Sequence, residues 1–293
     1  MKAIILNKPK VFLSLKTSLG EGPIWNHKTQ ELSFVDIMNN KFFIWKKGKL
    51  RKYSIPFYIS CLLPIKKNNW VSASENKIIE IKKNKKKIIY CVIKTIKEKL
   101  HNRFNDGKCD SEGRIWLSSM NKKEVLKSGK LFFFNKMLKQ KIKLKKFKIG
   151  NGIDWSPDDK KMYFVASDKR EVYSFNYNKK DGSITNKKII IKVPKQRGYP
   201  DGICIDSLGF IWIAYWDGKC VIRHFPNGEI QRVIKLPIKR PTSLCFGGKK
   251  LNKLFITSAK TSSKIKNNLD RDSGKIFVIQ TNIKGKKINF YKK

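Results

Sequence analysis

The sequence of 293 residues predicts an all-β fold, a six-bladed β-propeller in a single domain spanning residues 1–293. Helical periodicity is almost absent, and short runs rich in Ile, Val, Phe, Tyr and Trp alternate with Gly, Asn, Asp and Lys turns. A unit of paired strands recurs every roughly 45 to 50 residues, which is the length of a four-stranded propeller blade. About six such units fit into the chain, and a closed ring would cover the faces that one blade cannot bury alone.

The expected strands come in pairs joined by polar turns. The pairs are 31–37 with 42–46, 70–73 with 77–81, 114–118 with 130–134, 161–165 with 172–176, 210–214 with 221–225, and 253–257 with 275–279. Two pairs open with similar text, because residues 110–116 (DSEGRIW) parallel residues 206–212 (DSLGFIW). Residues 135–150 alternate Lys with Ile, Leu and Phe, which predicts a further strand with one exposed face. No Pro/Gly/Ser-rich linker divides the chain, as the rival architecture of two β-sandwiches would require.

The charge of the chain is strongly positive, with 66 Lys and Arg against 22 Asp and Glu and a net charge of +44. Such a balance first suggests a nucleic-acid-binding protein. However, most basic residues are lysines spread along the whole chain together with many Ile, Asn and Phe, the composition of an AT-rich genome. No nucleic-acid-binding motif is present, so we expect no specific nucleic-acid partner. A nucleic-acid-associated propeller would gain support only if the lysines gathered on one face around the channel.

The sequence also predicts where in the cell the protein is found. No apolar run is long enough to span a bilayer, and residues 1–15 lack the long apolar region of a secretory signal, so we expect a cytoplasmic protein without a membrane partner. The six cysteines form no C-x-x-C pair, which favours free thiols in a reducing compartment. The oligomeric state stays open.

Four segments place an oxygen-bearing side chain next to glycine, each just before a strand-like run. They are residues 19–23 (LGEGP), 103–108 (RFNDGK), 150–155 (GNGIDW) and 200–204 (PDGIC). Glu21, Asn151 and Asp201 would supply two carboxylates and an amide oxygen, the ligands that hard cations prefer. We therefore expect a metal site built from loops that meet at one end of the scaffold.

With residues 241–248 (PTSLCFGG), these segments resemble the gluconolactonase/regucalcin (senescence-marker protein) family, in order and with compatible spacing from Gly20 to Ile279. The resemblance implies a six-bladed propeller with a central metal-binding channel, which binds one divalent cation (Ca, Zn, Mg, Mn or Fe) and hydrolyses a small-molecule sugar lactone. It implies that Glu21, Asn151 and Asp201 are the metal ligands. It also implies that Arg103 and Asn105 face the substrate.

The sequence departs from this family pattern at two positions. In the family, a further glutamate follows the strand after the RFNDG motif. The ungapped match puts Lys123 in its place, whereas Glu124 fits only with a one-residue slip. Both residues are therefore candidates for substrate binding. Relatives commonly carry Asp at the position of Ala166. The metal set is intact, and the departures concern substrate preference.

The resulting hypothesis is a metal-dependent sugar lactone hydrolase. A divalent cation can polarise the lactone carbonyl and lower the pKa of a bound water, and Asp201 could both hold the metal and act as general base. The alternative is a non-catalytic calcium-binding regulatory propeller, which would need Glu21, Asn151 and Asp201 but not Arg103 and Asn105. Other Asp residues of the repeats, such as Asp154 and Asp206, are expected to accept hydrogen bonds within the blades.

Overall fold

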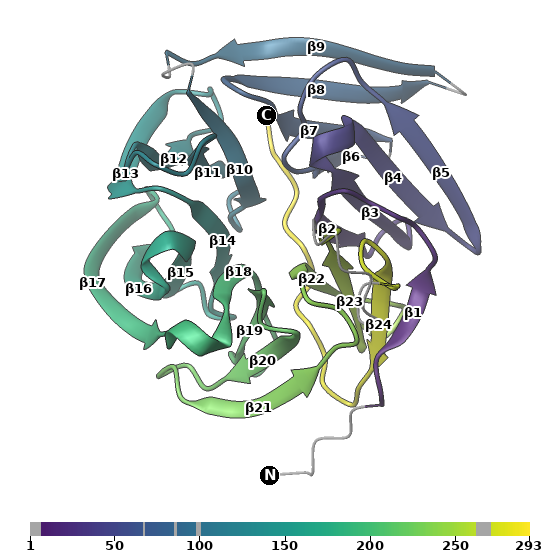
Figure 1. Ribbon diagram of the computed structural model, residues 1–293. Helices are drawn as coiled ribbons and strands as arrows, with labels where there is room; N and C mark the ends of the chain where they lie inside the picture. The colour runs from purple at the N-terminus through teal and green to yellow at the C-terminus, as the bar shows by residue number, and fades with distance from the viewer. Residues whose placement is uncertain (1–6, 67, 85–86, 98–100, 262–270) are drawn as a thin grey trace.

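A computed structural model of the protein describes residues 7–66, 68–84, 87–97, 101–261 and 271–293. Its strands form six four-stranded antiparallel sheets arranged in a ring, so the prediction of a six-bladed β-propeller is confirmed (Figure 1). Blades are numbered here in chain order, and within each blade the first strand lies nearest the axis of the ring.

Five of the blades are built from four consecutive strands. Blade 1 contains β2 (Gly20–Asn26), β3 (Glu31–Asp36), β4 (Lys41–Lys46) and β5 (Lys49–Ser54), and blade 2 contains β6 (Leu63–Lys66), β7 (Asn69–Ala73), β8 (Lys77–Asn84) and β9 (Lys87–Thr95). Blade 3 contains β10 (Asn102–Cys109), β11 (Ile115–Asn121), β12 (Gly129–Phe134) and β13 (Gln140–Phe147). Blade 4 contains β14 (Gly150–Trp155), β15 (Lys161–Ala166), β16 (Glu171–Asn178) and β17 (Ser183–Lys192), and blade 5 contains β18 (Tyr199–Ile205), β19 (Ile211–Trp216), β20 (Cys220–His224) and β21 (Ile230–Lys235).

Blade 6 closes the ring with strands from both ends of the chain. It contains β22 (Pro241–Gly247), β23 (Lys253–Ser258) and β24 (Ile276–Gln280), and its outermost strand is β1 (Lys10–Leu13), which pairs with β24. In the part of the chain that the structure describes, three short 3-10 helices connect strands: η1 (Ile37–Asn39), η2 (Ser167–Lys169) and η3 (Lys195–Arg197). None of the described helices is long and apolar enough to cross a membrane.

The predicted strand pairs are the second and third strands of the blades. The pair predicted at 161–165 and 172–176, for example, is β15 with β16, and the strand predicted within 135–150 is β13. Second strands are buried on both faces because each blade packs between two neighbours, which explains their continuous apolar runs. Outermost strands face solvent, and each carries an exposed lysine: Lys10, Lys52, Lys87, Lys141, Lys188 and Lys235. The lysines named here are thus distributed around the ring.

The core consists of layers between blades. Six hydrophobic clusters are present among the described residues, and each is shared by neighbouring blades around the ring. Between blades 3 and 4, Trp116 meets Trp155 edge to face at 5.8 Å, and between blades 5 and 6 Trp212 meets Phe246 at 5.5 Å. Every blade therefore depends on both neighbours to bury its apolar surface.

The repeated text DSxGxIW has a structural cause. Asp206 Oδ1 accepts hydrogen bonds from the backbone N–H groups of Leu208 and Phe210, and its Oδ2 accepts from Trp212 Nε1 at 2.9 Å and Arg223 Nη2 at 2.8 Å. Asp110 makes the equivalent bonds in blade 3, including one from the indole of Trp116 at 2.9 Å. The carboxylate fixes the turn between the first two strands and ties it to the blade, as expected for Asp206.

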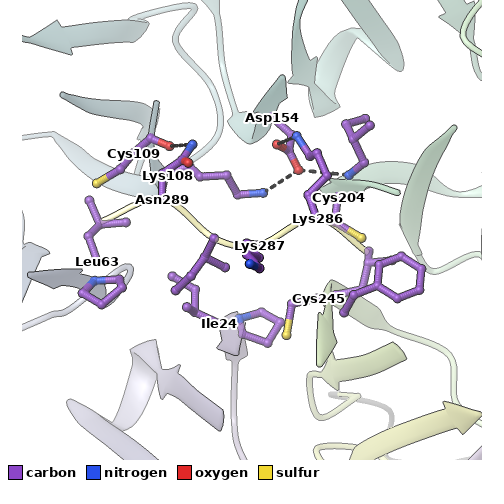
Figure 2. A pocket seen from close by; sticks show the side chains of 16 residues that line it. Ile24, Leu63, Lys108, Cys109, Asp154, Cys204, Cys245, Lys286, Lys287 and Asn289 are labelled. Atoms are coloured by element: carbon purple, nitrogen blue, oxygen red, sulfur yellow. Dashed lines mark hydrogen bonds and ion pairs between the residues drawn. The ribbon is translucent and has the colours of Figure 1, made fainter. Parts of the chain in front are cut away.

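After β24, residues 281–293 run across one end of the ring and contact all six blades (Figure 1). The contacts, from blade 6 to blade 1, are Gly285 N to Leu251 O (2.8 Å), Ser207 N to Lys284 O (2.9 Å), Lys286 Nζ to Asp154 Oδ1 (3.0 Å), Asn289 Nδ2 to Cys109 O (3.2 Å), Tyr291 N to Pro64 O (2.9 Å) and the Phe290 ring against His27. Figure 2 shows Lys286 and Lys108 on either side of the Asp154 carboxylate. We call residues 281–293 the C-terminal strap.

His224 in β20 is a buried histidine with two polar partners. Its Nδ1 lies 2.9 Å from Gly228 O, and its Nε2 lies 2.9 Å from the Tyr215 hydroxyl. Because a carbonyl can only accept, Nδ1 carries the proton and Nε2 accepts from Tyr215 in the neutral ring. Burial lowers the pKa of His224 to about 4, so the folded protein holds this ring neutral at pH 7.

We expect His224 to make folding pH-dependent. The unfolded chain takes up a proton at this residue near pH 6.5 and the folded chain only near pH 4, so its contribution is complete above pH 6.5 and is lost as the pH falls toward 4. The loss should amount to about 3 kcal/mol of unfolding free energy. Urea unfolding of the wild type and of His224→Gln above pH 6.5 and near pH 4 measures it, and an equal pH dependence in both proteins would contradict this assignment.

Candidate functional site

The innermost strands of four blades bring the predicted site residues to one cavity of about 520 Å³. It is lined by Glu21 from β2, Arg103 and Asn105 from β10, Asn151 from β14 and Asp201 from β18. Each of these residues comes from the first half of its strand. The second halves of the same strands line a smaller space at the other end of the axis, which the C-terminal strap covers (Figure 2).

The glycine-containing motifs lie within strands, and the expectation of loops was therefore wrong. In each innermost strand concerned, the ladder register shifts at the motif, between Glu21 and Ile24 in β2 and between Pro200 and Ile203 in β18. Such a bulge re-aims side chains and bends the strand, and its glycines make the sequence look like a turn. The motif therefore encodes a bulged strand whose polar side chains line the cavity.

Two motif glycines allow neighbouring innermost strands to approach each other. A Cβ atom on Gly152 would lie 2.6 Å from the backbone nitrogen of Ile203 in the next blade. A Cβ atom on Gly202 would lie 2.2 Å from Ser243 Oγ in the blade after that. These positions cannot hold a larger residue without separating the blades, so glycine follows Asn151 and Asp201 for a packing reason.

The two candidate carboxylate ligands are both buried. Burial raises the pKa of Glu21 to about 8, and the negative charge of Asp106 adds to the shift. Burial likewise raises the pKa of Asp201 well above its ordinary value, with Glu21 as the next cause and Asn151 opposing the shift. Asp201 Oδ1 is buried and has no hydrogen-bond partner. An unsatisfied carboxylate oxygen next to a second buried carboxylate is costly unless a cation binds there.

The amide of Asn151 is oriented by its neighbours. Its Nδ2 donates to Ser167 Oγ at 3.1 Å, and this hydroxyl donates to Pro200 O at 2.7 Å. The amide nitrogen is thereby occupied, and the amide oxygen stays available to a ligand. Ser167 begins η2 after β15 and carries no motif signal in the sequence.

The donor set suits a hard divalent cation. Two carboxylates and one amide oxygen are ligands of the kind that Ca²⁺, Mg²⁺ and Mn²⁺ take, and three protein ligands leave positions for water and substrate. Within the described ranges, no group of three or more His, Cys, Asp or Glu side chains is arranged to hold a metal ion. Any centre at this place therefore depends on the amide of Asn151 as well as on Glu21 and Asp201.

Arg103 and Asn105 lie beside the candidate ligands and brace each other. Arg103 Nη1 donates to Asn105 Oδ1 at 2.8 Å and to Phe104 O at 3.0 Å, and Asn105 Nδ2 donates to Gly150 O at 2.9 Å. Burial lowers the pKa of Arg103, while negative charge on nearby acidic groups, including Glu21, opposes the shift. The guanidinium is thus a fixed donor at the cavity wall.

Of the two candidates after β11, Glu124 lines the cavity and Lys123 does not. The backbone of Glu124 has a φ of 58°, and its N–H donates to Asn121 O at 3.0 Å in a tight turn. Lys123 is exposed beside this turn. The ungapped match points to Lys123 because it assumes a regular backbone. The left-handed conformation of Glu124 changes the direction of the chain, and glutamate gives no sequence signal for that conformation.

Several further residues line the cavity that the sequence did not single out. They are Lys148, Asp168, Tyr199, Trp216, Asp217 and Arg240. Tyr199 directly precedes the Pro200-Asp201-Gly202 motif, and Asp217 belongs to an Asp-Gly pair of the kind that usually marks a tight turn. Its position next to the motif is the only sequence signal that Tyr199 lines the cavity, since aromatic residues of a β-propeller more often belong to the core.

A six-bladed propeller with carboxylate, amide and guanidinium groups around one polar cavity on its axis defines the class of this protein. The chain belongs to the SMP-30/gluconolactonase/LRE-like family, whose model matches residues 19–260. It is 32% identical to regucalcin of Gallus gallus over 249 residues, which is 82% of this chain and 83% of that protein. Its fold matches a solved luciferin-regenerating enzyme with a TM-score of 0.90, 27% identity and coverage of 99% and 100% of the two chains. A gluconolactonase from Xanthomonas campestris matches with a TM-score of 0.74 at 16% identity, covering 93% and 89%.

We expect Asn151 and its positioning residue Ser167 to control cation affinity. If Asn151 is a ligand, Asn151→Leu should abolish binding of Ca²⁺ or Mn²⁺ measured by isothermal titration calorimetry. Ser167→Ala frees the amide to rotate and should weaken binding about tenfold or more, as loss of a group that orients a ligand does. Ser174→Ala, a buried serine in β16, is the matched control. Equal affinities for Ser167→Ala and the control would show that Ser167 does not orient Asn151.

Proposed function

We propose that the protein hydrolyses a sugar lactone with the help of one divalent cation held by Glu21, Asn151 and Asp201. The observation that carries the proposal is the buried, unpartnered Asp201 Oδ1 beside Glu21 and Asn151 in a member of this family. A structural relative bears the name gluconolactonase. Arg103, Asn105 and Glu124 in the same cavity add the groups that binding of a polyhydroxylated substrate requires.

The bound cation would polarise the lactone carbonyl and favour a deprotonated water beside it. The chain's own residues orient the substrate. Arg103 is braced by Asn105 and can donate fixed hydrogen bonds to the carbonyl or a hydroxyl, and the Glu124 carboxylate can accept from sugar hydroxyls. Positioning of this kind lowers the entropic part of the barrier.

Asp201 is the proposed general base. The oxygen of a water bonds to the carbonyl carbon while one of its protons passes to Asp201. The ring carbon–oxygen bond then breaks, and the leaving ring oxygen takes that proton from Asp201. The balance is lactone plus water giving the open hydroxy acid, with the carboxylate regenerated and no further reactant.

A second candidate function is calcium binding without catalysis. It is favoured by the relatives named regucalcin and by the fact that Glu21, Asn151 and Asp201 alone could bind the ion. A panel of aldonolactones assayed with several divalent cations separates the two. Cation-dependent turnover of any lactone supports the hydrolase, and tight Ca²⁺ binding without turnover supports the regulatory protein.

We expect Asp201→Asn and Glu21→Gln to respond differently to added cation. Asp201→Asn keeps an oxygen ligand but removes the proton acceptor, so hydrolysis should stay ~10²–10⁴-fold low even at saturating cation. Glu21→Gln acts through cation affinity, so saturating cation should restore much of its activity. Initial rates against cation concentration check both. If excess cation restores both variants equally, Asp201 is a ligand only.

We also expect Glu124, rather than Lys123, to contact the substrate. Glu124→Gln weakens a charge-assisted hydrogen bond and should raise KM for a sugar lactone roughly tenfold with little effect on cation affinity. Lys123→Gln tests the rival assignment, and Lys122→Gln, whose Nζ pairs with Glu75 at 2.7 Å, is the control on the same turn. A raised KM in Lys123→Gln with an unchanged KM in Glu124→Gln would reverse the assignment.

A further inference from the structure

The wall of the cavity contributed by blade 5 carries two aromatic rings without an assigned role. Tyr199 begins β18 and Trp216 ends β19, and the two are directly opposite each other in the ladder. Both line the cavity, and Tyr199 is 37% exposed. Opposite residues of an antiparallel pair project to the same face with Cβ atoms about 5 Å apart. Both side chains therefore project from the same face of the sheet toward the cavity; we call Tyr199 and Trp216 the aromatic pair.

Close backbone packing holds the aromatic pair in place. Gly198 has a φ of 82°, and a Cβ atom on it would lie 2.3 Å from Trp216 O. A Cβ atom on Gly218 would lie 2.5 Å from Arg197 O. The two glycines thus let the segment before Tyr199 pack directly on the turn after Trp216. The rings are presented by rigid backbone rather than by a free loop.

Each ring is also backed by an arginine. The Arg170 guanidinium lies 3.7 Å from the centre of the Tyr199 ring, and its Nη1 donates to Lys195 O and Gly198 O. The Arg240 guanidinium lies 4.6 Å from the centre of the Trp216 ring. A planar cation on one face fixes a ring and leaves the opposite face for a ligand.

The surroundings of the pair favour a sugar over another flat ligand. A pyranose has an apolar C–H face that stacks on an aromatic ring and hydroxyls at its edge that need polar partners. Asp217 and Arg240 line the cavity together with Trp216 and are joined by a 2.8 Å hydrogen bond from Arg240 Nε to Asp217 Oδ1. An aryl group would stack equally well but would offer no hydroxyl groups to Asp217 and Arg240.

The spacing relates the pair to the proposed reaction centre. Tyr199 precedes Asp201 by two residues on β18, a distance of about 7 Å along a strand, which is close to the length of one sugar unit. The cavity of about 520 Å³ falls within the ~300–1,000 Å³ range of sites for drug-sized ligands. It has room for more than one sugar ring.

We propose that the substrate is a disaccharide aldonolactone whose second ring stacks on Tyr199 and Trp216 while its lactone ring lies at Asp201. This inference rests on the proposed function, since it names the substrate class of the same site. It makes Trp216 a specificity-determining residue for the sugar beyond the lactone, with no part in the hydrolysis itself.

Comparing a single-ring and a two-ring lactone tests the inference. We expect a higher kcat/KM for the lactone of cellobionic acid than for gluconolactone. Trp216→Ala should lower kcat/KM for the two-ring lactone roughly three- to tenfold, the range of one aromatic contact, and leave the single-ring lactone unchanged. Trp216→Phe should retain most of the preference. Tyr90→Ala, an exposed aromatic residue on β9, is the matched control and should change neither rate.

A binding measurement separates failure of this inference from failure of the proposed hydrolase. Calorimetry with cellobionate and gluconate, the open acids, requires no turnover. Tighter binding of cellobionate that disappears in Trp216→Ala supports the aromatic pair even if the wild type hydrolyses neither lactone. Equal affinity for the two acids in the wild type, or a cellobionate preference that Trp216→Ala leaves intact, overturns the inference whatever the lactonase assay gives.

Discussion

The close approach of neighbouring innermost strands is the constraint on which the site depends. At Gly152 and Gly202 the next strand leaves no space for a side chain. The bulges at these motifs and the absence of a Cβ atom leave the adjacent polar residues, Asn151 and Asp201, on the cavity wall. Burial at that place raises the pKa of Asp201, so packing of the ring and chemistry of the cavity have the same structural origin.

The pKa values of buried carboxylates shift in opposite directions at the two ends of the axis. At the end covered by the strap, burial alone would raise the pKa of Asp154, but Lys108 and Lys286 on either side lower it below its ordinary value. At the open cavity, burial and the charge of Asp106 raise the pKa of Glu21, burial and the charge of Glu21 raise the pKa of Asp201, and Arg103 only partly opposes both shifts. The chain supplies its own cations to the first end. The second end retains a deficit of positive charge, which is the electrostatic argument for an exogenous cation there.

The sequence predicts those strands whose residue pattern can arise in only one way. Second and third strands are recognisable because burial on both faces requires runs such as that of β15. The motifs of the innermost strands predict loops, because a bulged strand uses the same glycine, Asn and Asp residues as a turn. Within the site, Glu21, Asn151 and Asp201 do line one cavity, whereas the position of Glu124 depends on a backbone conformation that its residue type does not signal.

The tertiary contacts of other site residues have no local signature at all. Ser167, Tyr199 and Trp216 are ordinary strand or turn residues in the sequence, and only the ring brings them to the cavity. The strap has no signature in the sequence either, because a segment held by scattered hydrogen bonds to several blades needs neither apolar periodicity nor turn residues.

The strap has a consequence for how this fold can diverge. Propellers can in principle gain or lose a blade by duplication or deletion, because each blade contacts only its neighbours. Here one segment of fixed length contacts all six blades, including Leu251 in blade 6 and His27 in blade 1. An added or deleted blade would put Lys286, Asn289 and Tyr291 out of register with their partners together. The contacts of the strap are therefore compatible only with a ring of six blades.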